Sequence, residues 1–275
     1  VPGNEHARDI LLGLRFRLDL YINFRPTRLF HPKLSPLRAD RRADGGSTGI
    51  DFVIFRENTE GQYLGKGRAE SVGTPDEVQV SEEINSRKGV ARIIEAAFAW
   101  AAAHGKRRVT MSDKSNAIPA QRLWGQLFQE IGGRYPGIER EHRYVDALAL
   151  ELVREPERFQ VIVTTNLYGD ILSDLGAGLI GGLGIAASAN LHPGRAGLYE
   201  PVHGSAPPLV GKGVANPMAT VLTGALMLDQ LGCAAGARKL EAAVEQVVAS
   251  GPLTPDLGGR GTTAEVARAL EAALS

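Results

Sequence analysis

Residues 159–183, which read FQVIVTTNLYGDILSDLGAGLIGGL, constrain the fold of this chain more than any other stretch. Residues 159–164 form an apolar, β-branched run of strand length, and the turn after it leads into a helix that we expect to begin near Asp170. A buried strand that feeds a helix is typical of α/β proteins. In such sheets, ligands bind at the carboxyl ends of the strands, so the stretch predicts a functional edge there.

Asp170 and Asp174 stand four residues apart at the predicted start of this helix, so both carboxylates project from one face. Such a pair can supply two oxygen ligands to a hard divalent cation. Two acids in a first helical turn also complement the helix dipole on a wet surface, which is a simpler explanation of the same spacing. Ile171, Leu172 and Leu175 close around the pair, and this favours a cleft at the sheet edge.

Gly176, Gly178 and Gly181 spell G-x-G-x-x-G, and Glu200 follows at about the distance expected of a ribose-binding acid. In a true dinucleotide fingerprint the first glycine follows the strand directly and opens the helix. Here more than a helical turn intervenes. We therefore interpret these glycines as sites of close packing followed by a loop.

The composition is that of an ordinary globular protein, with 43% hydrophobic and 23% charged residues in a chain of 275, which predicts one or two domains. Lys plus Arg equals Asp plus Glu at 31 each, so no net charge attracts nucleic acid or an anionic membrane. No bilayer-spanning run or signal peptide is present, so we expect a cytoplasmic protein. The single Cys233 excludes an intramolecular disulfide and a multi-thiolate metal site.

Segments of strand and helix character alternate along the chain, which predicts an α/β protein with a largely parallel sheet. Residues 65–81 are glycine-rich and charged, and we expect a projecting hairpin arm there. Ser86 or Asn85 is expected to cap a helix, and Thr262 and Glu265 have the spacing of a capping box. The apolar face of the capped helix is expected to comprise Val90, Ile93, Ile94, Ala97, Phe98 and Ala101, and that of the following helix Leu123, Leu127, Phe128 and Ile131. The remaining expected elements are strands at 18–23, 50–55, 108–112 and 197–199, helices at 7–17, 147–153, 217–231, 237–249 and 265–274, and a connection at 27–49.

Functional-looking side chains recur where the predicted strands end: Arg25, Arg56 with Tyr63, Lys114, Asp146 and the aspartate pair. Each has an ordinary alternative, because arginines form surface ion pairs, a lysine can be solvated and a tyrosine can pack in the core. Together, two arginines and a lysine that face two or three acids fit a metal-bound polycarboxylate.

The sequence His203-Gly204-Ser205 raises the alternative of a hydrolytic nucleophile at Ser205. A nucleophile elbow has the form G-x-S-x-G between a strand and a helix. No such sequence surrounds Ser205, so we do not interpret it as a nucleophile.

From about residue 11 to its C-terminus, the chain resembles the β-decarboxylating 2-hydroxyacid dehydrogenases, the isocitrate and 3-isopropylmalate dehydrogenase family. The resemblance rests on six motifs in order: LDLYINFRP, RENTEG, DKSN, YVDA, GDILSD and EPVHGSAP. It implies a two-domain open sheet with mostly parallel strands that is not a Rossmann fold. Residues 1–30 and 182–275 would form the cofactor-binding domain, and residues 31–181 the substrate, metal and dimerisation domain with its arm near 65–81.

The resemblance also implies roles for individual residues. Arg25 and Arg56 would bind the carboxylates of a malate-type substrate, while Asp146, Asp170 and Asp174 would surround Mg²⁺ or Mn²⁺. Lys114 would help to remove the hydroxyl proton, and Tyr63 would return a proton to the enolate. Lys114 and Asp146 would enter from the neighbouring subunit, which implies a homodimer. The adenosine half of NAD would be held by His203, Gly204, Ser205, Ala206 and Asn216.

Three departures from the family pattern stand out. Lys33 stands where the family usually has another substrate arginine, and Pro208 stands where NAD-dependent members usually have an aspartate. Because no cationic 2′-phosphate clamp is present either, we expect a modest preference for NAD over NADP. The family's opening strand with its Gly-Asp-Gly loop does not precede Val1, so we expect the chain to be N-terminally incomplete.

The helix before the arginine strand contains Leu11 and Leu12, which offer an apolar surface to an isopropyl group. This feature predicts oxidative decarboxylation of 3-isopropylmalate to 2-oxo-4-methylpentanoate, a step of leucine biosynthesis. Tartrate, D-malate, homoisocitrate and isocitrate stay open as alternative substrates within the family. A noncatalytic binding protein or an inactive fragment is the alternative of another class.

Overall fold

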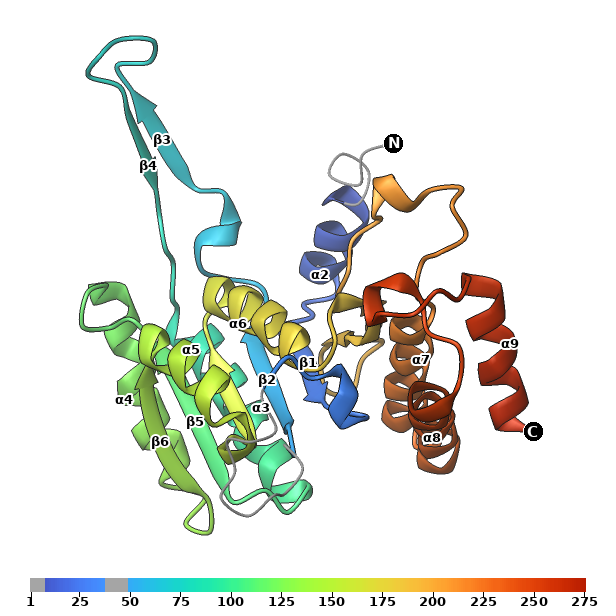
Figure 1. Cartoon of the computed structure of the whole chain (residues 1–275). Coiled ribbons are helices and arrows are strands. Elements are labelled where there is room, and N and C mark those ends of the chain that lie inside the picture. The colour runs from blue at the N-terminus through green and yellow to red at the C-terminus, as the bar shows by residue number, and fades with distance from the viewer. Residues whose placement is uncertain (1–7, 38–48) are drawn as a thin grey trace.

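The computed structural model describes residues 8–37 and 49–275, which form a seven-stranded sheet with helices on both faces and a separate two-stranded arm (Figure 1). The strand order is β6-β5-β7-β2-β1-β8-β9. The four strands from β6 to β2 are parallel, and β1, β8 and β9 continue the sheet in antiparallel pairs. The predicted α/β class with a mainly parallel sheet is confirmed.

The strands are β1 (Ile22–Arg28), β2 (Asp51–Glu57), β5 (Arg108–Asp113), β6 (Glu139–Tyr144), β7 (Val161–Thr164), β8 (Ala187–Leu191) and β9 (Leu198–Pro201), with β3 (Gly67–Glu70) and β4 (Val78–Ser81) in the arm. The helices are the π-helical turn η1 (Arg8–Leu12), α2 (Gly13–Arg17), α3 (Arg87–Ala103), α4 (Arg122–Gly132), α5 (Val145–Arg154), α6 (Asn166–Leu179), α7 (Met218–Gln230), α8 (Ala234–Ser250) and α9 (Thr263–Leu274). Within the described ranges, no helix has the length and apolar character that crossing a membrane requires.

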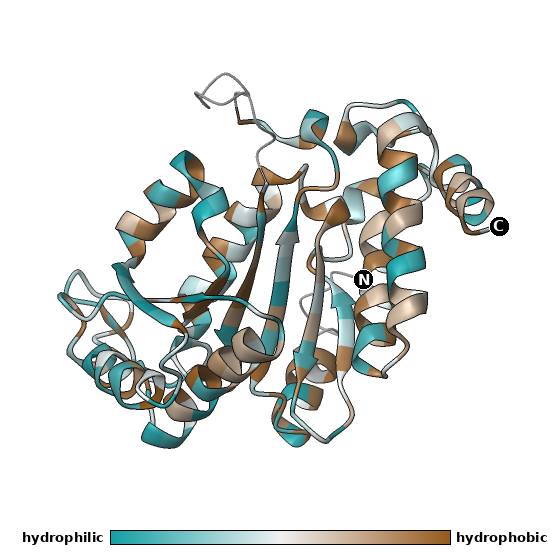
Figure 2. Cartoon of the chain, turned by 90° about the horizontal axis from the view of Figure 1, so that it is seen from below, coloured by the Kyte–Doolittle hydropathy of each residue, from teal (hydrophilic) through white to brown (hydrophobic). Residues whose placement is uncertain are grey.

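Two apolar cores hold the sheet and helices together. One lies against α3 and α4, and the other is built mainly from residues of α5 to α9 with the opposite-facing residues of β2 and β7. Figure 2 shows the apolar residues concentrated on the central strands, whereas the surrounding helices mix apolar and polar positions. Every residue predicted for the apolar face of α3 has no exposed surface, because the helical period aligns them toward the sheet.

Three local predictions are confirmed. β3 and β4 pair antiparallel as an exposed hairpin that projects away from the body of the protein (Figure 1). The N-cap of α3 is Ser86, whose side chain accepts a hydrogen bond from the backbone N–H of Gly89. Thr262 and Glu265 form the capping box of α9.

The strand that carries Arg25 was wrongly placed. The prediction placed this strand at residues 18–23, with Arg25 where the strand runs out into a loop. Instead, α2 ends at Arg17 with Leu18 as its C-cap, and β1 begins at Ile22 and runs through Arg25 and Pro26 to Arg28. Pro26 is tolerated because pairing with β8 ends at Phe24, so the strand has only β2 beside it from there on.

The start of α6 was also wrongly placed. Thr165 is its N-cap, with its side chain accepting from the backbone N–H of Tyr168, so the predicted turn is in fact the first helical turn. Asp170 and Asp174 therefore lie on the second and third turns, where the dipole explanation for the pair is weaker. Ile171 is 57% exposed, so it does not enclose the pair as expected.

Two strands were not predicted. β6 reads EREHRY and lies at the edge of the sheet, where polar residues are tolerated and the apolar signal is lost. β8 reads ASANL, and its small residues lack the β-branched character of a strand signal. The expected connection at 27–49 and the start of the first helix are described only in part, because residues 1–7 and 38–48 lie outside the described ranges.

Candidate active site

Two arginines and two aspartates meet where β1 and β2 run under α6. The antiparallel register places Asn23 opposite Arg56, so Arg25 and Arg56 emerge from neighbouring strands. The Nη2 and Nη1 atoms of Arg25 lie 3.5 Å from Oδ1 of Asp170 and 3.5 Å from Oδ1 of Asp174, respectively. Arg56 pairs with Oδ1 of Asp170 through Nη1. Strands β1 and β2 thus supply the positive charges of one site, and helix α6 supplies the negative charges.

Both guanidinium groups are buried and held by further hydrogen bonds. Arg56 is 2% exposed and Arg25 is 7% exposed. Arg56 donates through Nε and Nη2 to Oδ1 of Asn166 at 3.0 and 2.7 Å, and Arg25 donates through Nη1 to Oγ of Ser173 at 2.6 Å. Burial, with the positive charge of Arg25, lowers the pKa of Arg56 to about 10. Arg56 therefore remains charged at neutral pH.

The two aspartates differ in how well their charge is supported. Burial raises the pKa of Asp170, but the charge of Arg56 and the hydrogen bond from Tyr63 outweigh it, so this pKa lies below its ordinary value. Burial raises the pKa of Asp174 above its ordinary value, because Arg25 compensates only in part. Asp174 is the carboxylate that lacks a strong partner.

Tyr63 completes this cluster from η4 (Gln62–Leu64). Its hydroxyl donates to Oδ2 of Asp170 at 2.8 Å, and its ring centroid lies 5.3 Å from the guanidinium carbon of Arg56. Burial and the hydrogen bond to Asp170 raise the pKa of the Tyr63 hydroxyl. Tyr63 is therefore protonated at neutral pH and can serve as a proton donor.

Lys114 and Asp146 form a second cluster, at the end of β5 and the start of α5. Nζ of Lys114 donates to Oδ1 of Asp146 at 2.7 Å, and this bond lowers the pKa of Asp146. Across the residues that the structure describes, no three His, Cys, Asp or Glu side chains are arranged to hold a metal ion. Asp146 therefore does not join Asp170 and Asp174 within one chain.

The donor chemistry of Asp170 and Asp174 nevertheless fits a hard divalent cation. Two carboxylates one helical turn apart supply two oxygen ligands. The side chain of Asp174 is 55% exposed, and its contact with Arg25 is a long one of 3.5 Å, so its oxygens are accessible. The remaining ligands of such an ion would have to come from water, substrate or a second chain.

The prediction for Lys33 was wrong. Because β1 is antiparallel to β2, the segment after Arg28 leaves the sheet at the edge opposite Arg56. Nζ of Lys33 donates to the carbonyl oxygen of Ala249 at 3.1 Å, near the C-terminal end of α8. Lys33 therefore lies away from the arginine cluster.

Arg15 of α2 is a third cation near this cluster. Burial is the main reason that the pKa of Arg25 and of Arg56 is lowered, and the positive charge of Arg15 lowers both further. Nη2 of Arg15 pairs with Oε1 of Glu200 at 3.0 Å, while its Nε is buried without a hydrogen-bond partner. The sequence contained a signal for it, because Arg15 follows Leu11 by four residues and so shares a helix face with it. Leu11 and Leu12 are half-buried, and their substrate contacts stay a prediction.

The residues predicted to hold the cofactor all line one cavity of about 540 Å³. Asn216 is fixed there, because its Nδ2 donates to Oδ2 of Asp256 at 3.1 Å and its Oδ1 accepts from the backbone N–H of Met218 at 3.0 Å. Pro208 is exposed in the turn η8 (Pro207–Leu209), beside the lining residue Leu209. The predicted residues in the lining are His203, Gly204, Ser205, Ala206 and Asn216.

The glycines of the G-x-G-x-x-G stretch lie at the end of α6 and in the loop after it. A Cβ at Gly176 would lie 2.9 Å from Oγ1 of Thr27, which confirms close packing there, whereas a Cβ at Gly178 would have no atom within 4 Å, so the prediction of close packing was wrong for Gly178. Gly181 and Gly182 have φ values of 122° and 112°, and both line the cavity with Gly184. A Cβ at Gly184 would lie 2.2 Å from Oδ2 of Asp256. These glycines thus bring the loop backbone close to the cavity. They do not form the dinucleotide-binding turn that directly follows a strand in a Rossmann fold.

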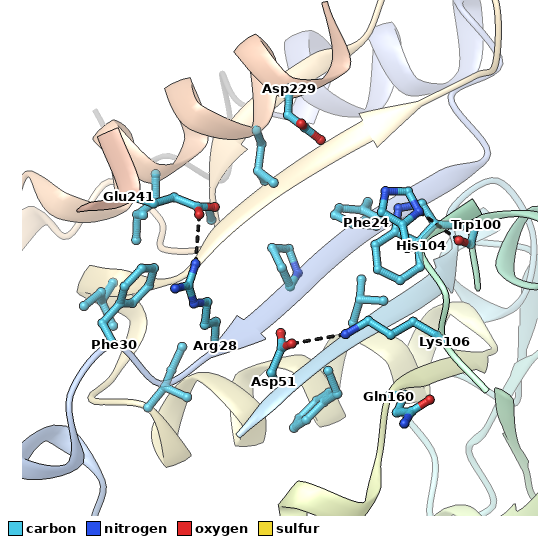
Figure 3. A pocket seen from close by; sticks show the side chains of 18 of the residues that line it. Phe24, Arg28, Phe30, Asp51, Trp100, His104, Lys106, Gln160, Asp229 and Glu241 are labelled. Atoms are coloured by element: carbon cyan, nitrogen blue, oxygen red, sulfur yellow. Dashed lines mark hydrogen bonds and ion pairs between the residues drawn. The ribbon is translucent and has the colours of Figure 1, made fainter. Parts of the chain in front are cut away.

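A second cavity of about 280 Å³ opens where β1 and β8 diverge (Figure 3). Phe24 and Trp100 supply aromatic surface, and two ion pairs, Arg28 with Glu241 and Lys106 with Asp51, lie in it. None of the predicted site residues lines this cavity.

Known proteins resemble the chain over nearly its whole length. The family model described as isocitrate/isopropylmalate dehydrogenase matches residues 1–270. A 3-isopropylmalate dehydrogenase of Beutenbergia cavernae is 43% identical over 279 residues, covering 99% of this chain and 76% of the relative. A D-malate dehydrogenase [decarboxylating] of Escherichia coli K12 is 43% identical over 280 residues, covering 98% and 76%.

A solved structure has the same fold. The crystal structure of isocitrate dehydrogenase from Methylococcus capsulatus superposes with a TM-score of 0.89 at 40% identity, covering 97% of this chain and 77% of the other.

Proposed function

The chain belongs to the isocitrate/isopropylmalate dehydrogenase family, as its motifs predicted, and we propose that it oxidises and decarboxylates 3-isopropylmalate with NAD as the hydride acceptor. The observation that carries the proposal is the meeting of the buried Arg25 and Arg56 with Asp170 and Asp174. Such a site suits a dicarboxylate that chelates a divalent cation, because the arginines match its carboxylates and the aspartates match the cation.

In this proposal the arginines fix the substrate. Arg25 and Arg56 bind its carboxylates, and Arg15 takes the third position that Lys33 does not occupy. Each guanidinium currently faces an acidic partner of the protein itself. Substrate carboxylates replace part of these ion pairs, so that no arginine is left buried without a counter-charge.

Asp170 and Asp174, with Asp146 of a second chain, hold Mg²⁺ or Mn²⁺. When bound, the cation polarises the substrate hydroxyl and the nicotinamide accepts the hydride, which is chemistry that the side chains cannot supply. Lys114, also from the second chain, removes the hydroxyl proton. Tyr63, whose hydroxyl carries its proton at neutral pH, returns a proton to carbon after carbon dioxide leaves. The functional unit is then a homodimer with shared sites.

The cavity lined by His203 and Asn216 holds the adenosine half of NAD. Its position supports a division in which residues 1–30 and 182–275 bind the cofactor, while residues 31–181 bind substrate and metal and contribute the dimerisation arm. The adjacent Pro208 offers neither a carboxylate for the ribose hydroxyls nor a cation for a 2′-phosphate, so the preference for NAD over NADP is modest.

D-malate is the second candidate substrate, because relatives named for either substrate match this chain at the same 43% identity. The apolar pair Leu11 and Leu12 favours 3-isopropylmalate, since D-malate has no alkyl group to bury. Full-length protein should be assayed with Mn²⁺ and NAD on 3-isopropylmalate, D-malate, tartrate, homoisocitrate and isocitrate. The highest kcat/KM is expected for 3-isopropylmalate, and a preference for isocitrate would refute the assignment.

The same assay tests whether the aspartates are functional. Asp170→Asn should abolish Mn²⁺-dependent turnover while the protein keeps its circular dichroism spectrum. Unchanged turnover in this variant would support a noncatalytic role for the pair.

A further inference from the structure

A continuous chain of hydrogen bonds joins Arg25 to Arg15, buried at the Arg25 end and partly buried at Glu200. Nε of Arg25 donates to Oδ1 of Asn23 at 2.7 Å, and Nδ2 of Asn23 donates to Oδ1 of Asn190 at 3.0 Å. Nδ2 of Asn190 donates to Oε1 of Glu200 at 2.9 Å, and the same oxygen accepts from Nη2 of Arg15 at 3.0 Å. We call Asn23, Asn190 and Glu200 the amide relay.

The amide relay is built into the sheet. Asn23 and Asn190 are register partners of β1 and β8, and Glu200 lies on the next strand, β9. Asn23 and Asn190 have no exposed surface. Polar groups so buried are costly unless they are hydrogen-bonded, so their partners determine their orientation.

The relay has one direction. A guanidinium can only donate and a carboxylate can only accept, so Arg25 fixes the orientation of Asn23, and Glu200 fixes that of Asn190. Both amide dipoles therefore run from a cation to an anion, and each bond polarises the next. Reversing either amide would place two donors or two acceptors face to face.

We infer that Asn190 is a positioning residue that couples Arg25 and Arg15, and so sets the spacing of two guanidinium groups that bind one substrate; this rests on the proposed function. The bond at Nε turns the Nη atoms of Arg25 toward Ser173, Asp170 and Asp174. At the other end, Glu200 orients Arg15. Asn190 touches neither substrate nor cofactor in this role, and acts through the arginines.

A merely structural role for Asn190 would also involve buried hydrogen bonds, and the neighbouring Asn58 provides the matched control. Nδ2 of Asn58 donates to the same Oδ1 of Asn190 at 3.0 Å, and Asn58 is only 3% exposed. It is not part of the path between the arginines. Asn58→Ala should therefore reduce thermal stability without changing the KM for the hydroxy acid.

The decisive test adds a negative charge at position 190 and then removes the one at position 200. Kinetics are measured on the full-length protein with Mn²⁺, NAD and 3-isopropylmalate or D-malate. Asn190→Asp replaces the donor to Glu200 with a second carboxylate, and should raise KM about tenfold or more with a smaller change in kcat. In Asn190→Asp combined with Glu200→Gln, the new glutamine can donate to Asp and accept from Arg15. The double variant should regain most of the lost affinity.

Additive losses in the double variant, or an Asn58→Ala variant that raises KM as much as Asn190→Asp, would overturn the coupling. If Asn190→Asp does not fold, Glu200→Gln is the test, because the Glu200 side chain is 21% exposed and its substitution should be tolerated. KM should then rise about threefold, and an unchanged KM would refute the relay. Arg25→Gln separates the two hypotheses. If its KM is unchanged, the proposed function fails; if KM rises while the Asn190 variants behave like wild type, only the relay fails.

Discussion

Gly169 of α6 is the position where the structure makes its sharpest quantitative prediction. A Cβ at this residue would lie 2.5 Å from both Cβ and Cγ of Arg56. These atoms belong to the root of the arginine side chain, which is 2% exposed and tied to Asn166 and Asp170, so a rotamer change cannot relieve the clash. Gly169→Ala should therefore move Arg56 out of position.

The expected effect combines two opposing contributions. Overpacking a tight core costs about 1–3 kcal/mol, whereas replacing glycine by alanine within a helix gains about 0.5–1 kcal/mol. The balance is a net loss of up to about 2.5 kcal/mol, and the displaced guanidinium should raise KM for the hydroxy acid about tenfold.

Gly178 provides the matched control in the same helix, because a Cβ there would have no atom within 4 Å. Gly178→Ala should leave KM unchanged and keep or slightly raise Tm. Thermal denaturation and steady-state kinetics of the two variants, side by side, measure both effects. If Gly169→Ala behaves like Gly178→Ala in both assays, the argument that Gly169 makes room for Arg56 is refuted.

Three further substitutions test charge and cofactor choice. The pKa of Asp174 is raised, so ionisation of this carboxyl lowers the stability of the fold as pH rises above 3.8. Without added metal, Asp174→Asn should therefore raise Tm at pH 7 and have no such advantage below pH 3.8. The variant should also show no Mn²⁺-induced rise in Tm. The pKa of Asp170 is lowered, so its ionised form contributes stability that is lost as pH falls through that pKa. Asp170→Asn should therefore lower Tm at pH 7. An equal rise in Tm for Asp170→Asn and Asp174→Asn would contradict the opposite pKa shifts of the two aspartates. Pro208→Asp should widen the ratio of kcat/KM for NAD over NADP. A wild-type ratio that favours NADP would contradict this reasoning and indicate that Lys212, four residues after Pro208, binds the 2′-phosphate.

The parts of the site that could be predicted are those where the apolar sequence pattern marks a strand and the parallel sheet fixes where that strand ends. Arg56 and Asp170 follow strands that the apolar runs mark clearly, and parallel strands bring their carboxyl ends to one edge. The prediction for Lys33 failed because it relied on the position of this residue in the family pattern. β1 runs antiparallel to β2, so the chain after Arg28 leaves the sheet at the end of β2 opposite Arg56. The direction of β1 relative to β2 is set by tertiary pairing, so it could not be read from sequence periodicity.

Asn23 and Asn190 show a different limit of sequence reasoning. Their function in the amide relay depends on partners 167 residues apart in the chain, and an asparagine inside a strand has no distinctive local pattern. Only the register of β1 with β8 brings them together. Buried polar networks of this kind are visible only when every donor and acceptor is assigned.

The charge balance of the site indicates how its ligands enter. Arg25 and Arg56 face Asp170 and Asp174, so the cluster is neutral without ligands. A divalent cation alone would leave two excess positive charges beside two buried arginines, and a dicarboxylate alone would leave two excess negative charges. Either imbalance is costly where charges are desolvated. When a cation and a dicarboxylate bind together, the site stays neutral. The arginines then pair with the substrate carboxylates, and the aspartates pair with the cation. In the proposed reaction, each ligand should therefore bind more tightly when the other is present, and by the same factor.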